Sequence, residues 1–223
     1  MLRIHRLERS GDGGDGVLLR ALDLDLADGQ CAWISGASGS GKTVFLRAVA
    51  DLDPNDGDLT LDGRGRNHFS APEWRRQVTY VSAEPVWWAE QVGAHFSDHV
   101  RAAELMVEIG LAADILDAEI TRLSTGERQR LALVRALVQG PRVILLDEPT
   151  SALDEKAVGA VEALLKKYRA DGLSVILVTH DPEQGKRLGD GCYAMRRGIL
   201  EKSVATADAA QQMGAGRGAP WIS

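Results

Sequence analysis

The feature that most constrains the fold is a glycine-rich loop placed directly after a short apolar run. The run Cys31–Ser35 reads CAWIS and is typical of a buried parallel strand. The loop Gly36–Thr43 reads GASGSGKT and fits the pattern G-x-x-x-x-G-K-[ST]. The residues Thr43–Ala50 that follow have helical character. A strand, a loop of this pattern and a helix in this order predict an α/β fold.

The loop has the chemistry of a phosphate site. Its glycines permit backbone angles that side chains forbid, so its N–H groups can surround an anion, and the next helix favours an anion at its N-terminus. We expect Lys42 to reach the β- and γ-phosphates of a nucleotide and Thr43 to bind Mg²⁺. A chance glycine-rich turn is the alternative, and the flanking strand and helix argue against it. The expected nucleotide-binding residues are Gly36, Ala37, Ser38, Gly39, Ser40, Gly41, Lys42 and Thr43.

A second segment suits the metal and the water of phosphoryl transfer. Val143–Glu148 reads VILLDE, an apolar strand that ends in two carboxylates. Asp147 is placed to hold Mg²⁺, and Glu148 can act as general base. Taken alone, the pair is equally well explained as an ordinary strand end before Pro149. Its combination with the glycine-rich loop favours the site.

Three shorter segments complete a pattern, namely Leu123–Arg130 (LSTGERQR), Ser151–Asp154 (SALD) and Thr179–Asp181 (THD). With the two segments above, and in this order, they resemble the ATP-binding subunits of ABC transporters over most of the chain. The resemblance implies a P-loop NTPase fold, with a parallel-sheet core, an antiparallel β layer and a short α-helical subdomain. It also implies ATP and Mg²⁺ as cofactors and ATP hydrolysis as the activity.

The resemblance assigns roles to individual residues. The glycine-rich loop corresponds to Walker A, Asp147 to the Walker B aspartate and Glu148 to the catalytic glutamate. His180 corresponds to the switch histidine that contacts the γ-phosphate, so Lys42, Glu148 and His180 form the expected catalytic set. Without the resemblance, His180 would be an ordinary histidine at a strand end. The segment SALD corresponds to the D-loop, which couples two sites across a dimer.

The signature segment has two compatible interpretations. Ser124 and Gly126 occupy the positions that, in the resembled family, touch the γ-phosphate bound by the other subunit. Ser124 with Glu127 also forms the S-x-x-E pattern of a capping box, which is the better interpretation of these residues by themselves. The helix predicted over Glu127–Leu137 is the same in both cases.

The sequence departs from the family in three places. The family glutamine that senses Mg²⁺ and water is replaced by Ala83, and Glu84 could stand in for it if the loop shifts by one residue. The segment Ser10–Gly16, where the family often has an aromatic that stacks on adenine, contains none and suggests a flexible hairpin tip. The signature reads STGE rather than SGGQ. The first change bears on the hydrolysis rate and metal coordination, and the second on base affinity and the preference for ATP over GTP. The third keeps the small-residue character and is tolerable at a helix start.

Composition limits the classes of function. The chain has 223 residues and a net charge of −6, which argues against a nucleic-acid-binding surface. No stretch approaches the roughly 20 apolar residues of a membrane-spanning helix, and the N-terminus lacks a secretory core. Cys31 and Cys192 are expected to be small core hydrophobes. We therefore expect a cytoplasmic protein that is peripheral on the inner face of the cell membrane through a partner.

The expected organisation is a single ABC ATPase domain over 1–223. Residues 1–82 and 138–202 would form the RecA-like core with its antiparallel layer, about 86–137 the helical subdomain with the signature motif, and 203–223 a loosely ordered tail. The expected elements are strands at Leu2–Glu8, Ala21–Leu26, Leu59–Leu61, Val78–Ser82 and Val175–Val178, helical structure at Gln91–Ile120 and Glu155–Ala170, and a strand pair around Tyr193 and Ile199.

Tryptophans mark two further places. Trp87 and Trp88 follow the Ala83 loop, where the resembled family faces its membrane partner. Exposure as interface anchors and burial in the helical subdomain are equally compatible with the sequence. Trp74, with Arg75 and Arg76, is expected to lie on a solvated helix face.

The leading hypothesis is the ATPase subunit of a small ABC transporter. A homodimer of cassettes would enclose two Mg-ATP and drive an integral membrane permease subunit, with no nucleic acid involved. The short helical region and the length most resemble FetA (YbbL)-type cassettes, which are associated with metal or iron efflux. The alternatives are a soluble non-transport ABC ATPase and a weakly hydrolysing nucleotide-dependent regulator.

Overall fold

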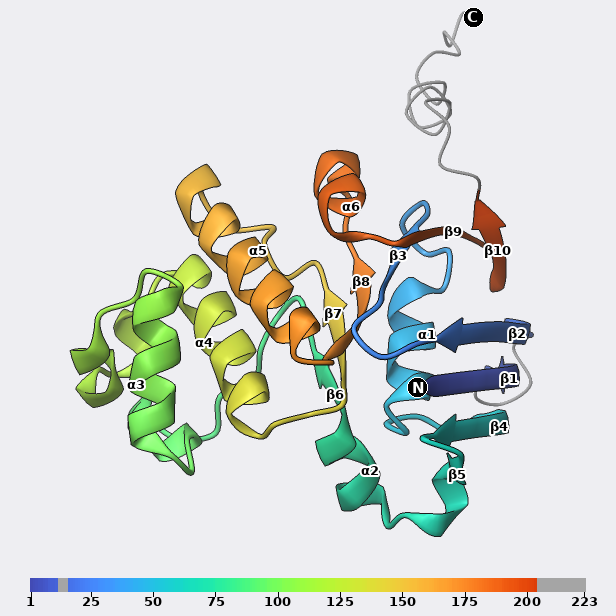
Figure 1. Cartoon of the computed structure of the whole chain (residues 1–223), viewed down its shortest axis with the longest axis horizontal. Coiled ribbons are helices and arrows are strands. Elements are labelled where there is room, and N and C mark those ends of the chain that lie inside the picture. The colour runs from blue at the N-terminus through green and yellow to red at the C-terminus, as the bar shows by residue number, and fades with distance from the viewer. Residues whose placement is uncertain (12–15, 204–223) are drawn as a thin grey trace, which may run out of the picture.

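The computed structural model describes residues 1–11 and 16–203, which form two β-sheets and a group of helices (Figure 1). The strands are β1 (Leu2–Ser10), β2 (Val17–Leu26), β3 (Cys31–Ser35), β4 (Asp56–Leu61), β5 (Arg64–Gly65), β6 (Val78–Val81), β7 (Val143–Asp147), β8 (Ser174–Val178), β9 (Gly191–Arg196) and β10 (Ile199–Ser203). The helices are α1 (Lys42–Val49), α2 (Ala71–Gln77), α3 (His99–Glu108), α4 (Thr125–Val138), α5 (Glu155–Ala170) and α6 (Pro182–Leu188).

The larger sheet brings distant loops to one edge. Its order is β10-β9-β3-β8-β7-β6, and all neighbouring strands are parallel except the β9–β10 pair. Every residue of β7 and β8 is buried, as expected for strands covered on both faces. Because parallel strands end at the same edge, the loops after β3, β7 and β8 meet there. The predicted parallel core is confirmed.

The smaller sheet is antiparallel and has the order β2-β1-β4-β5. In β2 the side chains of Leu22, Leu24 and Leu26 are buried while Asp23 and Asp25 are exposed, which is the predicted alternation. The strand begins at Val17, earlier than the predicted Ala21. Helix α1 lies between the two sheets and contacts strands of both (Figure 1).

The region predicted to be helical, about Gln91–Ile120, is divided into several short helical segments. Only His99–Glu108 forms an α-helix, and short 3₁₀ turns occupy much of the remainder. Asp98 starts α3 by accepting a 2.9 Å hydrogen bond from the Arg101 N–H, and Gly110, with a φ of 72°, follows its end. The buried side chains of α3 pack with those of α4 in one core cluster that extends to β7 and β8.

Trp74 corrects one prediction. The expected solvated face of its helix includes Arg75 and Arg76, which are exposed, but Trp74 is fully buried. Its indole N–H donates a 2.9 Å hydrogen bond to the carbonyl oxygen of Val49 at the end of α1. A capping box of Ser70 and Glu73 marks the start of α2.

Other predictions fall outside the described part or are refined by it. Residues 12–15 of the predicted hairpin tip (Ser10–Gly16) and residues 204–223 of the predicted tail (203–223) lie outside the described residues. Cys31 is buried and Cys192 is half-buried, and neither forms a disulfide. Within the described residues, no helix has the length and apolar character needed to cross a membrane.

Candidate active site

The glycine-rich loop joins β3 to α1 in a tightly packed bend. Gly36 has a φ of 152°, and a Cβ added there would lie 2.4 Å from the carbonyl oxygen of Met195. Only glycine fits such an approach. Gly41, with a φ of 110°, directly precedes α1, whose first N–H groups therefore open toward the loop.

Lys42 closes over this loop. Its ammonium donates hydrogen bonds of 2.7 Å to the Gly36 carbonyl and 3.0 Å to the Ala37 carbonyl. Burial lowers the pKa of Lys42, and the nearby carboxylates of Glu148 and Asp147 act in the opposite direction. The Ser40 hydroxyl is buried without a hydrogen-bond partner among the described residues. An ammonium, a helix N-terminus and an unsatisfied hydroxyl together fit a polyphosphate.

Two side chains converge on one carboxylate at the end of β7. The Thr43 hydroxyl donates a 2.7 Å hydrogen bond to Oδ2 of Asp147, and the Tyr80 hydroxyl lies 3.1 Å from the same oxygen. Asp147 is 5% exposed. A hydroxyl and a carboxylate side by side are the oxygen ligands that Mg²⁺ prefers, so these residues fit the expected metal.

Tyr80 was not identified from the sequence. Burial, together with the charge and hydrogen bond of Asp147, raises the pKa of Tyr80, so its phenol stays protonated and donates. The residue reaches Asp147 because β6 lies beside β7, where Tyr80 pairs with Leu145. The sequence signal that could have identified Tyr80 was its place in a predicted strand that ends at the same edge of the sheet as Asp147.

Glu148 and His180 form a second pair. The carboxylate accepts a 3.1 Å hydrogen bond from the His180 backbone N–H, and its other oxygen lies 3.2 Å from Nε2 of the His180 ring. Burial raises the pKa of Glu148, and the contacts with His180 oppose that shift. Glu148 has a φ of 50°, a left-handed conformation that costs a non-glycine residue about 1–3 kcal/mol.

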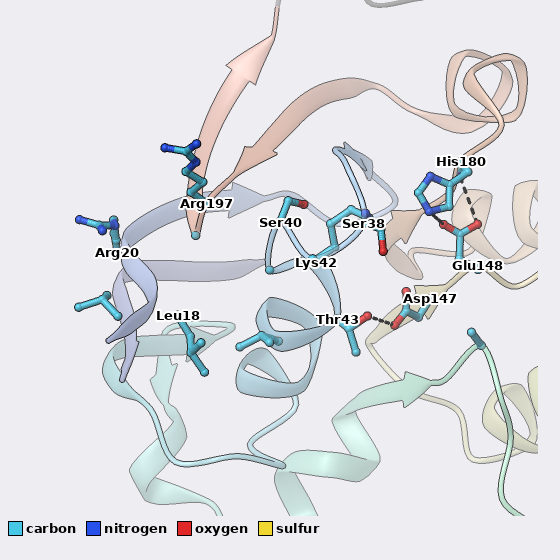
Figure 2. A pocket seen from close by; sticks show the side chains of 16 residues that line it. Leu18, Arg20, Ser38, Ser40, Lys42, Thr43, Asp147, Glu148, His180 and Arg197 are labelled. Atoms are coloured by element: carbon cyan, nitrogen blue, oxygen red, sulfur yellow. Dashed lines mark hydrogen bonds and ion pairs between the residues drawn. The ribbon is translucent and has the colours of Figure 1, made fainter. Parts of the chain in front are cut away.

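These groups share one cavity of about 550 Å³. Figure 2 shows Lys42 and Thr43 between Asp147, Glu148 and His180 on one side and Arg20 and Arg197 on the other. The volume is in the range of small-ligand sites. At the arginine end the lining comes from Val17, Leu18, Arg20, Arg197 and Gly198.

The loop at Ala83 also reaches the cavity. Ala83 lines it, whereas Glu84 is exposed and is not among the described lining residues. The Ser82 hydroxyl donates a 2.7 Å hydrogen bond to the Glu84 carbonyl. In this structure, therefore, the Glu84 carboxylate does not take the place of the glutamine that the resemblance leads one to expect.

The signature residues lie elsewhere. Neither Ser124 nor Gly126 is among the described residues that line the cavity. The Ser124 hydroxyl accepts the Glu127 N–H at 3.2 Å, and the Glu127 carboxylate accepts the Ser124 N–H at 2.8 Å. The capping-box interpretation is confirmed, and the N-terminus of α4 begins at this box.

Comparisons with known proteins agree with this geometry. The family model described as "ABC transporter" matches residues 19–151. The aliphatic sulfonates import ATP-binding protein SsuB 2 of Agrobacterium fabrum is 36% identical over 86% of this chain and 76% of its own length. The pyoverdine export ATP-binding/permease protein PvdT of Pseudomonas fluorescens is 33% identical over 98% of this chain, which spans 36% of that protein.

A solved structure supports the same relationship. A dimeric ATP-binding cassette in a post-hydrolysis state, bound to ADP and Pi, superposes with a TM-score of 0.81 and 25% identity, over 92% of this chain and 100% of that one. The predicted P-loop NTPase fold is thereby confirmed, and ATP, Mg²⁺ and ATP hydrolysis follow from the family. The chain belongs to the ABC transporter family, as one of its ATP-binding ATPase cassettes.

Proposed function

We propose that this chain is the ATP-hydrolysing subunit of an ABC transporter, and that it dimerises around two Mg-ATP and powers a membrane permease. The observation that carries the proposal is the single cavity shared by the phosphate loop, the Thr43–Asp147 pair and the Glu148–His180 pair (Figure 2). A nucleoside triphosphate held by the loop places its terminal phosphate near both pairs.

Each group has a distinct task at that phosphate. Lys42 and the α1 N-terminus hold the β- and γ-phosphates by charge and hydrogen bonds. Thr43 and Asp147 hold Mg²⁺, which when bound neutralises the charge that develops on the phosphates. The roles fit the residue types and their contacts in the structure, which bring the Lys42 ammonium and the oxygens of Thr43 and Asp147 to one cavity.

Glu148 is the proposed general base. The backbone N–H and the ring of His180 contact this carboxylate from one side. These contacts fix the orientation of the carboxylate, which can then take a proton from an attacking water. Burial raises the pKa of Glu148, and a more basic carboxylate removes a proton more readily. His180 both orients this carboxylate and can contact the γ-phosphate.

A second copy of the chain supplies what one cavity lacks. Ser124 and Gly126 are at the N-terminus of α4, outside the described lining of their own cavity. A helix N-terminus with small residues suits an anion held by another molecule. We propose that this end of α4 contacts the γ-phosphate of the partner cassette, and that about 86–137 acts as the helical subdomain that carries it.

The proposed contact with the permease is a surface next to the Ala83 loop. Val86 is 74% and Trp88 is 70% exposed there, and the Arg135 guanidinium lies 4.5 Å from the Trp87 ring centroid and 4.9 Å from that of Trp88. Trp87 is partly buried against the core cluster. The two tryptophans thus divide between burial and exposure, and Trp88 suits an interface anchor on a protein held at the inner membrane face.

The cargo belongs to the permease in this proposal. The relatives are named for import in one case and export in another, which leaves the direction of transport to the membrane partner. Export of a metal such as iron is the finer hypothesis, and it rests on the resemblance of the short helical region and of the run Leu123–Glu155 to FetA (YbbL)-type cassettes. Transport measured with the co-purified permease, with metal ions and organic anions as candidate cargo, tests this hypothesis.

The test uses tagged Glu148→Gln protein with Mg-ATP, recovered from its native membranes in detergent. We expect turnover to fall by about 100-fold or more, a dimer that retains ATP, and a polytopic membrane protein in stoichiometric amount. Lys42→Met serves as the control, since it should prevent nucleotide binding and the dimer. Unchanged turnover, or recovery of ribosomal or other soluble partners alone, would refute the proposal and favour a non-transport ATPase or a regulator.

A further inference from the structure

The side chain of Gln129 links separate segments around the catalytic carboxylate. It lies in the second turn of α4 and is 5% exposed. Its amide nitrogen lies 2.9 Å from the Ser151 hydroxyl and 3.3 Å from the carbonyl oxygens of both Ala83 and Glu148. Its oxygen accepts the Ala152 N–H at 3.2 Å. One buried carboxamide therefore uses both its donor and its acceptor side.

Glu148 needs such support because of its left-handed backbone. Conformations of this kind persist when the surrounding structure holds them on both sides. The Glu148 N–H is held by the Val178 carbonyl at 2.9 Å. Its carbonyl accepts from Gln129 and from the hydroxyl and N–H of Ser151, at 3.2 Å and 3.3 Å. Gln129 thus contacts the carbonyl side of Glu148 directly, and through Ser151 as well.

A close backbone approach joins the start of α4 to the same segment. A Cβ added at Gly126 would lie 2.8 Å from the Ala152 carbonyl oxygen, so the first turn of α4 packs against that loop. Three residues later on the helix, Gln129 binds the Ala152 N–H. A displacement of α4 therefore moves the segment that follows Glu148, because packing and hydrogen bonds join the two.

We infer that Gln129 is a positioning residue that fixes the backbone of Glu148 and ties it to the first turn of α4. The inference rests on the proposed function, since Glu148 is the proposed base. The Ala83 loop contributes only its backbone carbonyl to this group of hydrogen bonds. The side chain that connects this loop to Glu148 is therefore that of Gln129, on α4. Nucleotide binding at the phosphate loop does not require this arrangement, whereas the placement of the base does.

Three variants test the inference. Gln129→Met keeps the length of the side chain and removes its donors and acceptor. Ser151→Ala weakens the same tie through an exposed residue, and serves if the methionine variant does not fold. Gln139→Met is the matched control, because Gln139 caps the C-terminus of the same helix and its amide donates to the Arg135 carbonyl at an exposed position.

The readouts separate positioning from general damage. We expect Gln129→Met to lower kcat by about 10-fold or more, to leave the KM for ATP and the Kd for ADP within about twofold of wild type, and to speed hydrogen exchange at the Ala152 amide. Ser151→Ala should change kcat in the same direction by less. Gln139→Met should match wild type in all of these.

Contrary outcomes are distinct. A Gln129→Met protein with unchanged kcat overturns the inference, and so does one that loses ADP affinity and kcat in equal proportion. A wild-type protein that does not turn over ATP refutes the proposed function and the inference together, whatever the variants do. Unchanged exchange at Ala152 overturns the claim that this contact holds the segment.

Discussion

The Tyr80 hydroxyl donates a hydrogen bond of 3.1 Å to Oδ2 of Asp147. The same oxygen accepts from Thr43, so two hydroxyls from different elements hold one carboxylate in place. The arrangement fixes the direction of Asp147 before any further ligand is considered. Tyr80 thereby acts on the metal site through Asp147, without being a metal ligand itself in our proposal.

Removal of this hydroxyl should weaken metal binding. In Tyr80→Phe we expect the Mg²⁺ concentration for half-maximal activity to rise about fivefold, which corresponds to about 1 kcal/mol for one hydrogen bond. Nucleotide binding measured in EDTA should be unchanged, because the phosphate loop is intact. Fluorescent-nucleotide titrations with and without Mg²⁺ make the comparison. Equal weakening under both conditions would contradict the role given to Tyr80.

Asp53 makes stability depend on acid pH. It accepts two hydrogen bonds of 2.8 Å from Arg47 and also contacts Arg9. Hydrogen bonds from Arg47 and Arg9 hold the pKa of Asp53 below its ordinary value of 3.8, against the effect of burial. This contribution is complete above pH 3.8 and is lost as the pH falls through the lower folded-state pKa.

Asp53→Asn should therefore lower the free energy of unfolding at pH 7 by about 2 kcal/mol. The difference from wild type should shrink as the pH falls below that ordinary value, since wild type then loses the same contribution. Urea unfolding across pH measures both. Asp58→Asn, at an exposed position of β4, is the control and should change little. A difference that stays constant with pH would disprove the assignment.

Trp74 and Trp88 offer a matched pair for stability. Trp74→Phe leaves the buried Val49 carbonyl without its donor and should cost about 1–3 kcal/mol. Trp88→Phe removes the same group at a site 70% exposed and should stay within about 0.5 kcal/mol. Circular dichroism during urea unfolding measures both. Equal losses would show that the two environments do not differ as described.

The base preference should be weak. At the cavity end away from His180, Leu18 offers an aliphatic contact to any purine, and Arg20 and Arg197 offer only donors. The O6 of guanine accepts such donors, whereas the N6 amino group of adenine does not. We expect kcat/KM for ATP and GTP to lie within about 10-fold. A preference for ATP above about 100-fold would contradict this account.

The parts of the site that are formed by contiguous residues could be predicted from the local sequence pattern. The apolar runs before Gly36 and Glu148 predicted strands, and parallel strands bring their ends to one edge. The helix predicted over Glu155–Ala170 matches α5 at both ends. Its boundaries were visible because Asp154 caps it and Gly172 follows it, which are strong local signals.

Contacts across the fold were beyond local pattern. Tyr80 and Gln129 act through neighbours that are distant in sequence, and nothing adjacent to them marks that role. Trp74 was predicted wrongly because Arg75 and Arg76 beside it suggested solvent, while burial depends on α1. The helical character expected at about Gln91–Ile120 gave no internal boundaries for a related reason, since its apolar residues are buried from a series of short turns as well as from a helix.

The contact of Lys42 with its own loop has a kinetic consequence. Its two hydrogen bonds to the Gly36 and Ala37 carbonyls brace the loop with groups of the chain itself. When a nucleotide binds, the Lys42 ammonium exchanges these two carbonyl oxygens for phosphate oxygens, and no segment has to fold around the phosphates. We therefore expect the association rate constant for the nucleotide to be high and to change with temperature little more than diffusion does. The affinity for the nucleotide is then set by its dissociation rate.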